Sequence, residues 1–223
     1  FFIFFSYDIF LYMDQSNSLP TKIPIFPLSN FIVFPETTVP LNIFEPRYLQ
    51  MIDDSMSNNR IIGMIQPKKT GNLKNPDLFD VGCVCRIISF NETVDGRYLI
   101  SLEGVNCFKV NFELEKTNSF RSVDANIIQS LSADEEIKDD VLLKRILGRY
   151  GDYIKKNNIK LDIKELDCLE LSQLIKFIAM VSPFSNTEKQ MCLESSNTLD
   201  FGNKLISILE INCSSIEENE TIN

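Results

Sequence analysis

The spacing of apolar side chains changes once along this chain, and that change limits the possible folds more than any other feature. Before about residue 130, apolar residues recur at every second position, as at Phe108, Val110, Phe112 and Leu114, which is typical of half-buried antiparallel strands. After residue 131 they recur every three or four positions, which is typical of amphipathic helices. Strands followed by helices predict an α+β protein. Seven strands are expected, at residues 22–28, 37–44, 60–66, 81–90, 97–103, 105–115 and 120–129.

Two connections within the strand region have recognisable signals. Asp95-Gly96 lies between two strand patterns, and its glycine accepts the positive φ that a hairpin turn needs, so strands 81–90 and 97–103 are expected to pair. A helix is expected from Pro46 to the polar residues 57–59, closing one end of a barrel. Residues 67–80 are polar and contain Gly71 and Pro76, so we predict a long loop without regular structure and regard it as a candidate binding lip.

The helical region also has recognisable boundaries. Ser132 and Glu135 form a capping-box pattern before a helix that is expected to end near Asn157. Helices are also expected over 169–181, after Ser185 with Glu188, and over 199–211. The expected organisation is therefore a barrel at 19–130, a helical bundle at 131–211 and a disordered tail at 212–223, preceded by a non-core segment at 1–18. Within that segment we expect Met13 to be the true start and residues 1–12 to be upstream translation.

The residue content excludes several classes of function. The chain has no His and a formal net charge of −9, which removes imidazole chemistry and makes nucleic acid an unfavourable partner. No phosphate-binding glycine loop is present. Cys83 and Cys85 could share a soft metal, but without two further ligands they are better interpreted as small buried apolar residues. We therefore predict a non-catalytic, cytoplasmic protein with reduced thiols, no cofactor, no metal and no membrane segment.

Several segments resemble the N-terminal domain of Lon-type ATP-dependent proteases. They are 23–28 (IPIFPL), 34–36 (FPE), 39–48 (VPLNIFEPRY), 80–84 (DVGCV), 95–100 (DGRYLI), 104–105 (GV), 180–184 (MVSPF) and 188–190 (EKQ). The likeness extends over residues 19–211. It implies a PUA-like antiparallel β-barrel followed by a helical bundle, and a role in holding protein substrates. In the full proteases the ATPase and the Ser–Lys peptidase lie further along the chain, so the resemblance implies a free-standing member without either.

The leading hypothesis is a polypeptide-binding module that acts as an adaptor or sensor in protein quality control. Its expected partner is an unfolded or specific polypeptide, with a protease in trans as a further partner, and the oligomeric state stays open. The binding surface is expected to be apolar and to lie where barrel meets bundle. The candidate binding residues are Phe44, Glu45, Arg47, Tyr48, Leu78 and Phe79. The alternatives are an RNA-binding PUA-like protein and a barrel that binds a small molecule.

Overall fold

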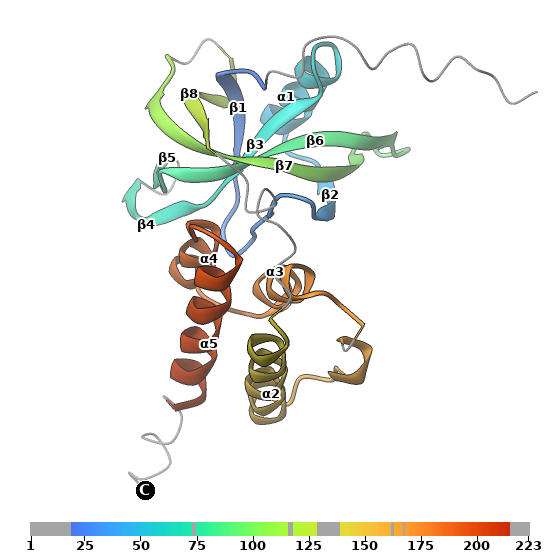
Figure 1. Ribbon diagram of the computed structural model, residues 1–223. Helices are drawn as coiled ribbons and strands as arrows, with labels where there is room; N and C mark the ends of the chain where they lie inside the picture. Colours follow the sequence, from blue (N-terminus) through green and yellow to red (C-terminus); the bar gives the residue numbers. More distant parts are fainter. Residues whose placement is uncertain are drawn as a thin grey trace, which may run out of the picture.

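The computed structural model describes residues 19–72, 75–115, 118–128, 139–161, 163–166 and 168–214, and it shows a β-barrel above a group of helices (Figure 1). The strands are β1 (Lys22–Pro27), β2 (Thr38–Ile43), β3 (Ile61–Ile65), β4 (Pro67–Asn72), β5 (Asn75–Leu78), β6 (Val81–Glu92), β7 (Tyr98–Glu113) and β8 (Arg121–Ile128). The helices are α1 (Pro46–Met56), α2 (Asp140–Lys156), the 3-10 helix η3 (Ile163–Leu166), α3 (Leu171–Val181), α4 (Asn186–Leu193) and α5 (Thr198–Ser214). The predicted α+β class is confirmed.

One long strand, β7, closes the sheet into a barrel. The strand order is β2-β7-β6-β3-β1-β8, and a further pairing of β8 with β7 joins the two sides. Residues 97–103 and 105–115, predicted as two strands, form this single strand. It passes through Gly104, where a Cβ atom would lie 2.1 Å from the backbone oxygen of Phe34. The barrel is antiparallel, as predicted, at every described pairing but one: β1 and β3 pair in parallel, with β2 and α1 between them in the chain.

The two ends of the barrel are covered differently. Pro46 begins α1, as predicted, and Tyr48, Met51 and Ile52 of this helix are buried. Helix α1 lies at the end of the barrel away from the bundle (Figure 1). The prediction of a structureless loop at 67–80 is wrong: β4 and β5 form a two-stranded hairpin there. Its second strand ends at Leu78, which is half-buried against the barrel core, so packing orders a segment whose sequence has no strand periodicity.

The bundle follows the sequence signals closely where it is described. The Ser132–Glu135 cap lies outside the described residues, and α2 begins at Asp140 with the side chain of Asp139 accepting from two backbone N–H groups. Ser185 and Glu188 form the predicted capping box of α4. Helix α5 continues to Ser214, so the predicted tail is helical over 212–214, and its remainder lies outside the described residues. Among the described residues no helix is long and apolar enough to span a bilayer.

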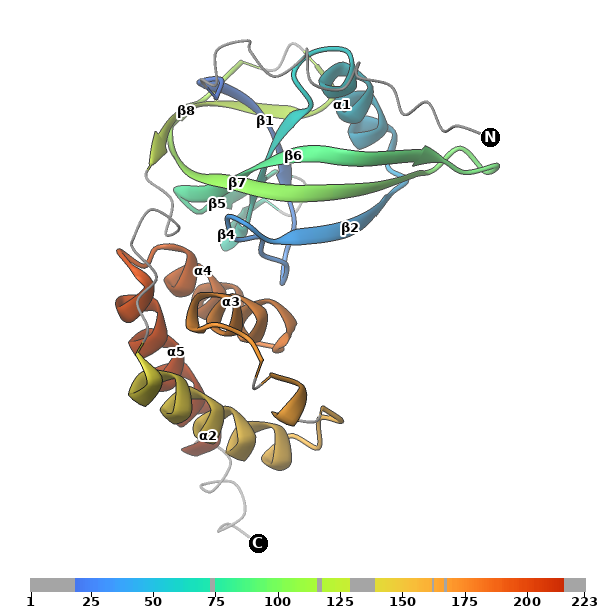
Figure 2. The same ribbon diagram turned by 45° about the vertical axis from the view of Figure 1, so that its right-hand side comes forward.

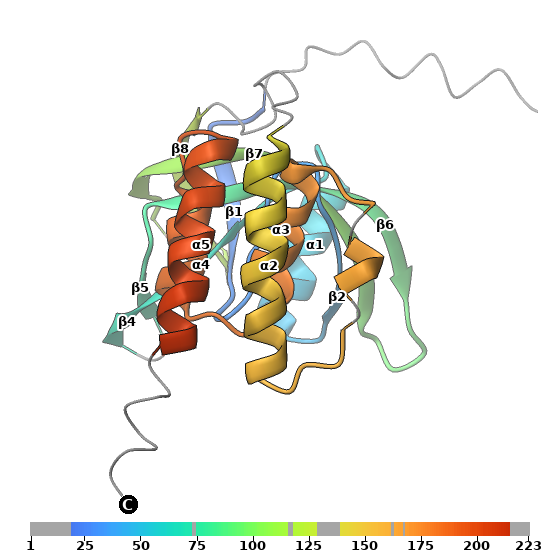
Figure 3. The ribbon, with the colours of Figure 1, turned by 60° about the horizontal axis from the view of Figure 1, so that its bottom comes forward.

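Helices α2 and α5 lie side by side (Figure 3). At Gly202 of α5 a Cβ atom would meet Leu142 of α2 at 2.9 Å, so glycine permits this close approach. The bundle core is continuous with the barrel because Phe34, Val81 and Cys107 belong to the same buried cluster as α2, α3 and α5. The ring of Phe34 lies 5.1 Å from that of Phe201. Barrel and bundle therefore share one apolar interface.

Candidate polypeptide-binding surface

The turn between β2 and α1 carries four of the predicted binding residues, and the structure divides them. Phe44 is 64% exposed. Glu45 and Arg47 form an exposed ion pair at 2.8 Å. Tyr48 is buried, with its ring 4.1 Å from that of Phe26 and the Arg47 guanidinium 4.5 Å from its centre. Burial raises the pKa of Tyr48, and the charge of Arg47 partly opposes this. Tyr48 thus anchors α1, while Phe44 and the ion pair remain accessible.

Leu78 and Phe79 lie at the other end of β6. Phe79 donates its backbone N–H to the Gln66 oxygen at 3.0 Å, and the Lys68 amino group lies 5.8 Å from its ring centre. Lys68 also pairs with Asp80 at 3.3 Å. These residues lie just before Val81, the first residue of β6. The turn before α1 lies near the opposite end of β6, because Ile43 and Glu92, the last residue of β6, both pair with Tyr98. The structure therefore does not bring the two predicted groups into one site.

Four of the exposed apolar side chains among the described residues lie on a part of the molecule that contains no predicted binding residue. Residues 88–99, the outer ends of β6 and β7 with the turn between them, project from the barrel (Figure 2). We call them the β6–β7 arm. Its exposed apolar side chains are Ile88, Phe90, Val94 and Leu99. One feature of the sequence indicates an exposed apolar side chain here. Leu99 and Ile100 are adjacent, so apolar side chains occupy both faces of β7 at this point.

An aromatic pair and a carboxylate connect this arm to α1. The ring centres of Phe90 and Tyr98 lie 4.8 Å apart in an edge-on arrangement. The Tyr98 hydroxyl donates to Asp53 at 2.9 Å. That hydrogen bond raises the pKa of Tyr98, and the negative charges of Asp53 and Glu92 act in the same direction. The face of the arm toward α1 is therefore aromatic and acidic.

The expected groove between barrel and bundle is filled with specific contacts. Gln190 donates to the Val81 oxygen at 2.9 Å and accepts from Gln66 at 3.1 Å. Asn186 accepts from the Asn30 backbone at 2.6 Å. Lys176 is buried and pairs with Glu36 at 2.9 Å. This junction holds the two parts of the molecule together.

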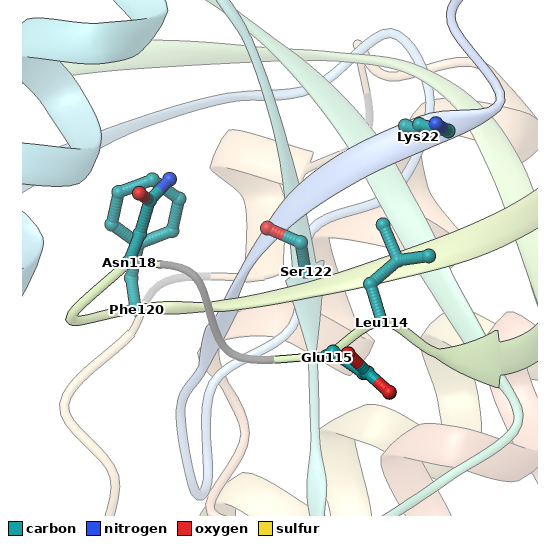
Figure 4. A pocket seen from close by; sticks show the side chains of 6 residues that line it. All are labelled: Lys22, Leu114, Glu115, Asn118, Phe120 and Ser122. Atoms are coloured by element: carbon teal, nitrogen blue, oxygen red, sulfur yellow. The ribbon is translucent and has the colours of Figure 1, made fainter.

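A shallow pocket of about 450 Å³ lies at the mouth of the barrel beside β1 and the end of β7. Figure 4 shows Asn118 and Phe120 at one side, with Lys22 and Leu114 at the other. Glu115 and Ser122 complete its described lining. The lining combines one ammonium, one carboxylate, one amide and one hydroxyl with the apolar side chains of Leu114 and Phe120. Among these side chains there is no pair in hydrogen-bond contact that would form a nucleophile and its base.

Four of the six cysteines are buried, whereas Cys168 is exposed and Cys213 is half-buried. Cys83, Cys85, Cys107 and Cys192 are buried, and all six cysteines are free thiols. Burial raises the pKa of Cys83 well above its usual value and that of Cys192 to about 12. For Cys83 and Cys192 burial thus favours the thiol over the more nucleophilic thiolate. Among the described residues no three potential ligands are grouped to hold a metal ion.

Comparison with known proteins gives a consistent result. Residues 22–210 match the ATP-dependent protease La (LON) substrate-binding domain. The Lon protease of Buchnera aphidicola subsp. Baizongia pistaciae is 27% identical over 205 residues, which cover 89% of this chain and 26% of that protein. The Lon protease of Escherichia coli K12 is 24% identical, with 89% and 26% covered. The chain thus spans about a quarter of the length of the curated relatives it matches.

Two solved structures share the fold. The Lon N-terminal domain protein from Xanthomonas campestris aligns with a TM-score of 0.60 at 22% identity, covering 86% of this chain and 98% of that one. The N-terminal domain of Mycobacterium avium complex Lon protease aligns with a TM-score of 0.62 at 14% identity, covering 85% and 98%. With a family match over most of its length, this chain belongs to the LON substrate-binding domain family.

Proposed function

We propose that this protein binds unfolded or extended segments of other polypeptides and acts as an adaptor or sensor in protein quality control. One observation carries the proposal: a domain of a substrate-binding family exposes apolar side chains on a projecting arm. Ile88 is 48% exposed and Phe90 is 39% exposed. Exposed apolar side chains that gather on one projecting element are typical of surfaces that bind other chains.

We include Phe44 in the same proposed surface because it is exposed and follows Ile43, which pairs with Tyr98 of the arm. Glu45 and Arg47 would then form its polar rim, with Tyr48 holding the turn. Leu78 and Phe79 are half-buried at the other end of β6 and would form at most a secondary contact. The observed contacts thus favour the first predicted group.

The proposed setting is the cytoplasm, where six free thiols are stable. The curated relatives are Lon proteases. We propose that the held segment passes to ATP-dependent proteolytic machinery, including a protease acting in trans. The chemistry of degradation would be carried by that machinery, and this domain would supply affinity for the substrate.

The test measures binding of fluorescein-labelled, reduced and carbamidomethylated α-lactalbumin by anisotropy at physiological salt. We expect saturable binding by the wild-type protein. The double variant Ile88→Ser/Phe90→Ser should weaken it at least tenfold, because truncating anchor side chains at an interface costs on the order of 1–2 kcal/mol each.

The matched control is Val141→Ser/Ile211→Ser, which removes two exposed apolar side chains from the bundle, 79% and 64% exposed. This control should bind like the wild type. Equal binding by all three proteins would reject the arm as the binding surface, and no binding by the wild type would reject the function.

A further inference from the structure

The arm and the neighbouring strand β2 together have two open strand edges among the residues that the structure describes. Strand β3 pairs with β6 only from Met64 opposite Cys83 to Ile61 opposite Arg86. One further hydrogen bond, from Ile87 N to Arg60 O at 2.9 Å, ends this side of the ladder. Beyond it, the β6–β7 register shifts at Ile88, and residues 89–92 pair with β7 alone. On the other side of the arm, β2 pairs only with β7.

The edge of β2 is protected by a proline. The Thr37 oxygen accepts from Gly104 N, so Thr37 directs its carbonyl toward β7. Alternation along the strand then places the backbone groups of Thr38, Pro40 and Asn42 at the outer edge. Because Pro40 has no N–H, an added strand would lose a hydrogen bond at the centre of this edge.

The edge of β6 has no such protection. Thr93 donates its N–H to Arg97 O at 2.9 Å, so its backbone faces β7. Alternation directs the N–H and C=O groups of Asn91 the same way and those of Phe90 and Glu92 toward the open edge. These four unpaired backbone groups have the geometry that a further strand requires.

The side chains beside this edge differ in chemistry along its length. Phe90 lies opposite Ile100, and Glu92 lies opposite Tyr98, so both project on the face toward α1. Asp53 of α1 meets the same face through its hydrogen bond to Tyr98. In the described part of the chain, Asp53, Asp54 and Glu92 form no ion pair, whereas Arg97 is paired with Asp95 at 2.8 Å. The end of the edge at Glu92 therefore presents uncompensated negative charge.

We propose that the open edge of β6, at residues 88–92, binds an extended segment of substrate polypeptide as an additional strand. The segment places Lys or Arg opposite Glu92 and an apolar side chain opposite Phe90, two positions away. Main-chain hydrogen bonds to Phe90 and Glu92 give affinity, and the alternating side chains give selectivity. This inference rests on the proposed function and names its substrate class: extended segments in which basic and apolar residues alternate with small polar ones.

A second copy of this chain is a less favourable occupant of the same edge. Each copy carries a formal net charge of −9. Pairing two β6 edges would also bring the unpaired carboxylates of both arms close together, which opposes association. A basic segment has the complementary charge.

The test uses three short fluorescein-labelled peptides on the full chain. In the first, Lys and Val alternate with Thr and Ser. The second has Glu in place of Lys. The third keeps the Lys sequence but carries backbone N-methyl groups on the edge that would face β6. We expect the Lys peptide to bind and the N-methylated peptide to bind at least tenfold more weakly, because methylation removes the donors while leaving the side chains.

Three variants separate the backbone from the charge. Glu92→Pro removes the carboxylate together with an N–H that faces the open edge and breaks no bond to β7, so the fold should persist while Lys-peptide binding falls at least tenfold. Glu92→Gln removes the carboxylate but keeps the N–H, so it should weaken Lys-peptide binding by no more than about threefold. Glu92→Lys keeps the N–H and should reverse the preference between Lys and Glu peptides, by about threefold in each direction at low salt. Asp152→Lys, at an exposed position of α2, matches this charge change and should leave the preference as in the wild type.

The outcomes distinguish this inference from the proposed function. The strand-addition proposal would be overturned if Glu92→Pro bound the Lys peptide as tightly as the wild type does, and if the wild type bound the N-methylated peptide as tightly as the Lys peptide. If α-lactalbumin were still bound in that case, the proposed function would stand. Failure of the wild type to bind either α-lactalbumin or the peptides would remove both. A dimer in sedimentation that Glu92→Pro dissociates would show that a second copy occupies the edge, and would overturn the inference.

Discussion

The β6–β7 arm and the barrel–bundle junction use their side chains in opposite ways. At the junction, polar groups such as Gln190 and Lys176 are buried and partnered, and the rings of Phe34 and Phe201 are fully enclosed. On the arm, Ile88 and Phe90 are exposed, and backbone groups at the edge of β6 face outward. A buried polar group that is satisfied fixes one arrangement of two elements, whereas an exposed apolar group contributes little to folding. The contrast supports a stabilising role for the junction and the proposed binding role for the arm.

The strongest challenge to this division is removal of an aromatic ring from the junction. Phe201→Ala should lower the free energy of unfolding by about 3–5 kcal/mol, because it leaves a cavity against Phe34 where relaxation is limited. Urea denaturation followed by circular dichroism measures this. Phe90→Ala on the arm removes the same ring and is the control, with an expected cost of no more than about 1 kcal/mol. Equal losses of unfolding free energy in the two variants would contradict the division of roles between the junction and the arm.

Replacing a buried polar side chain tests the same junction, with a smaller expected loss of stability. Gln190→Leu removes the donor to the Val81 oxygen and the acceptor for Gln66, leaving both buried groups without that partner. We expect a loss of about 2 kcal/mol in unfolding free energy. At temperatures where the variant is folded, its affinity for the Lys peptide should match that of the wild type.

Glu194→Gln is the control for that variant, since it keeps a carbonyl acceptor for the Gln190 amide. Its unfolding midpoint should stay close to that of the wild type. A loss of peptide affinity in Gln190→Leu without a loss of stability would mean that the junction takes part in binding, and the division between the two regions would fail.

The sequence predicted local features well and non-local ones poorly. The Asp95-Gly96 hairpin and the Ser185–Glu188 cap depend on neighbouring residues, and both were found as expected. The β4–β5 hairpin was missed because residues 67–80 lack strand periodicity and are ordered by packing, as Leu78 shows. Phe44 was selected for its position at a strand-to-helix turn, and it is exposed. The open edge of β6 depends on β3 ending opposite Arg86, which no pattern within β6 could reveal.

The smallest expected effect concerns the hydrogen bond that joins the arm to α1. Tyr98→Phe removes the donor to Asp53 at an exposed position, so solvent screening should limit the loss of stability to about 0.5 kcal/mol or less.

The direction of the Tyr98 pKa shift determines how this contribution to stability depends on pH. The pKa of Tyr98 is raised in the folded state by the bond to Asp53, so the contribution is complete below the unfolded value of 10.0. It is lost as the pH rises through the folded pKa. The difference in unfolding midpoint between wild type and variant should therefore be constant from neutral pH to about 10 and shrink above it, in urea titrations run at each pH. Tyr150→Phe, at the bundle core, gives the comparison, because burial is the main cause of its raised pKa. If the Tyr98 difference instead grew with rising pH, the bond to Asp53 would not be the cause, and the arm would be held against α1 by its apolar contacts alone.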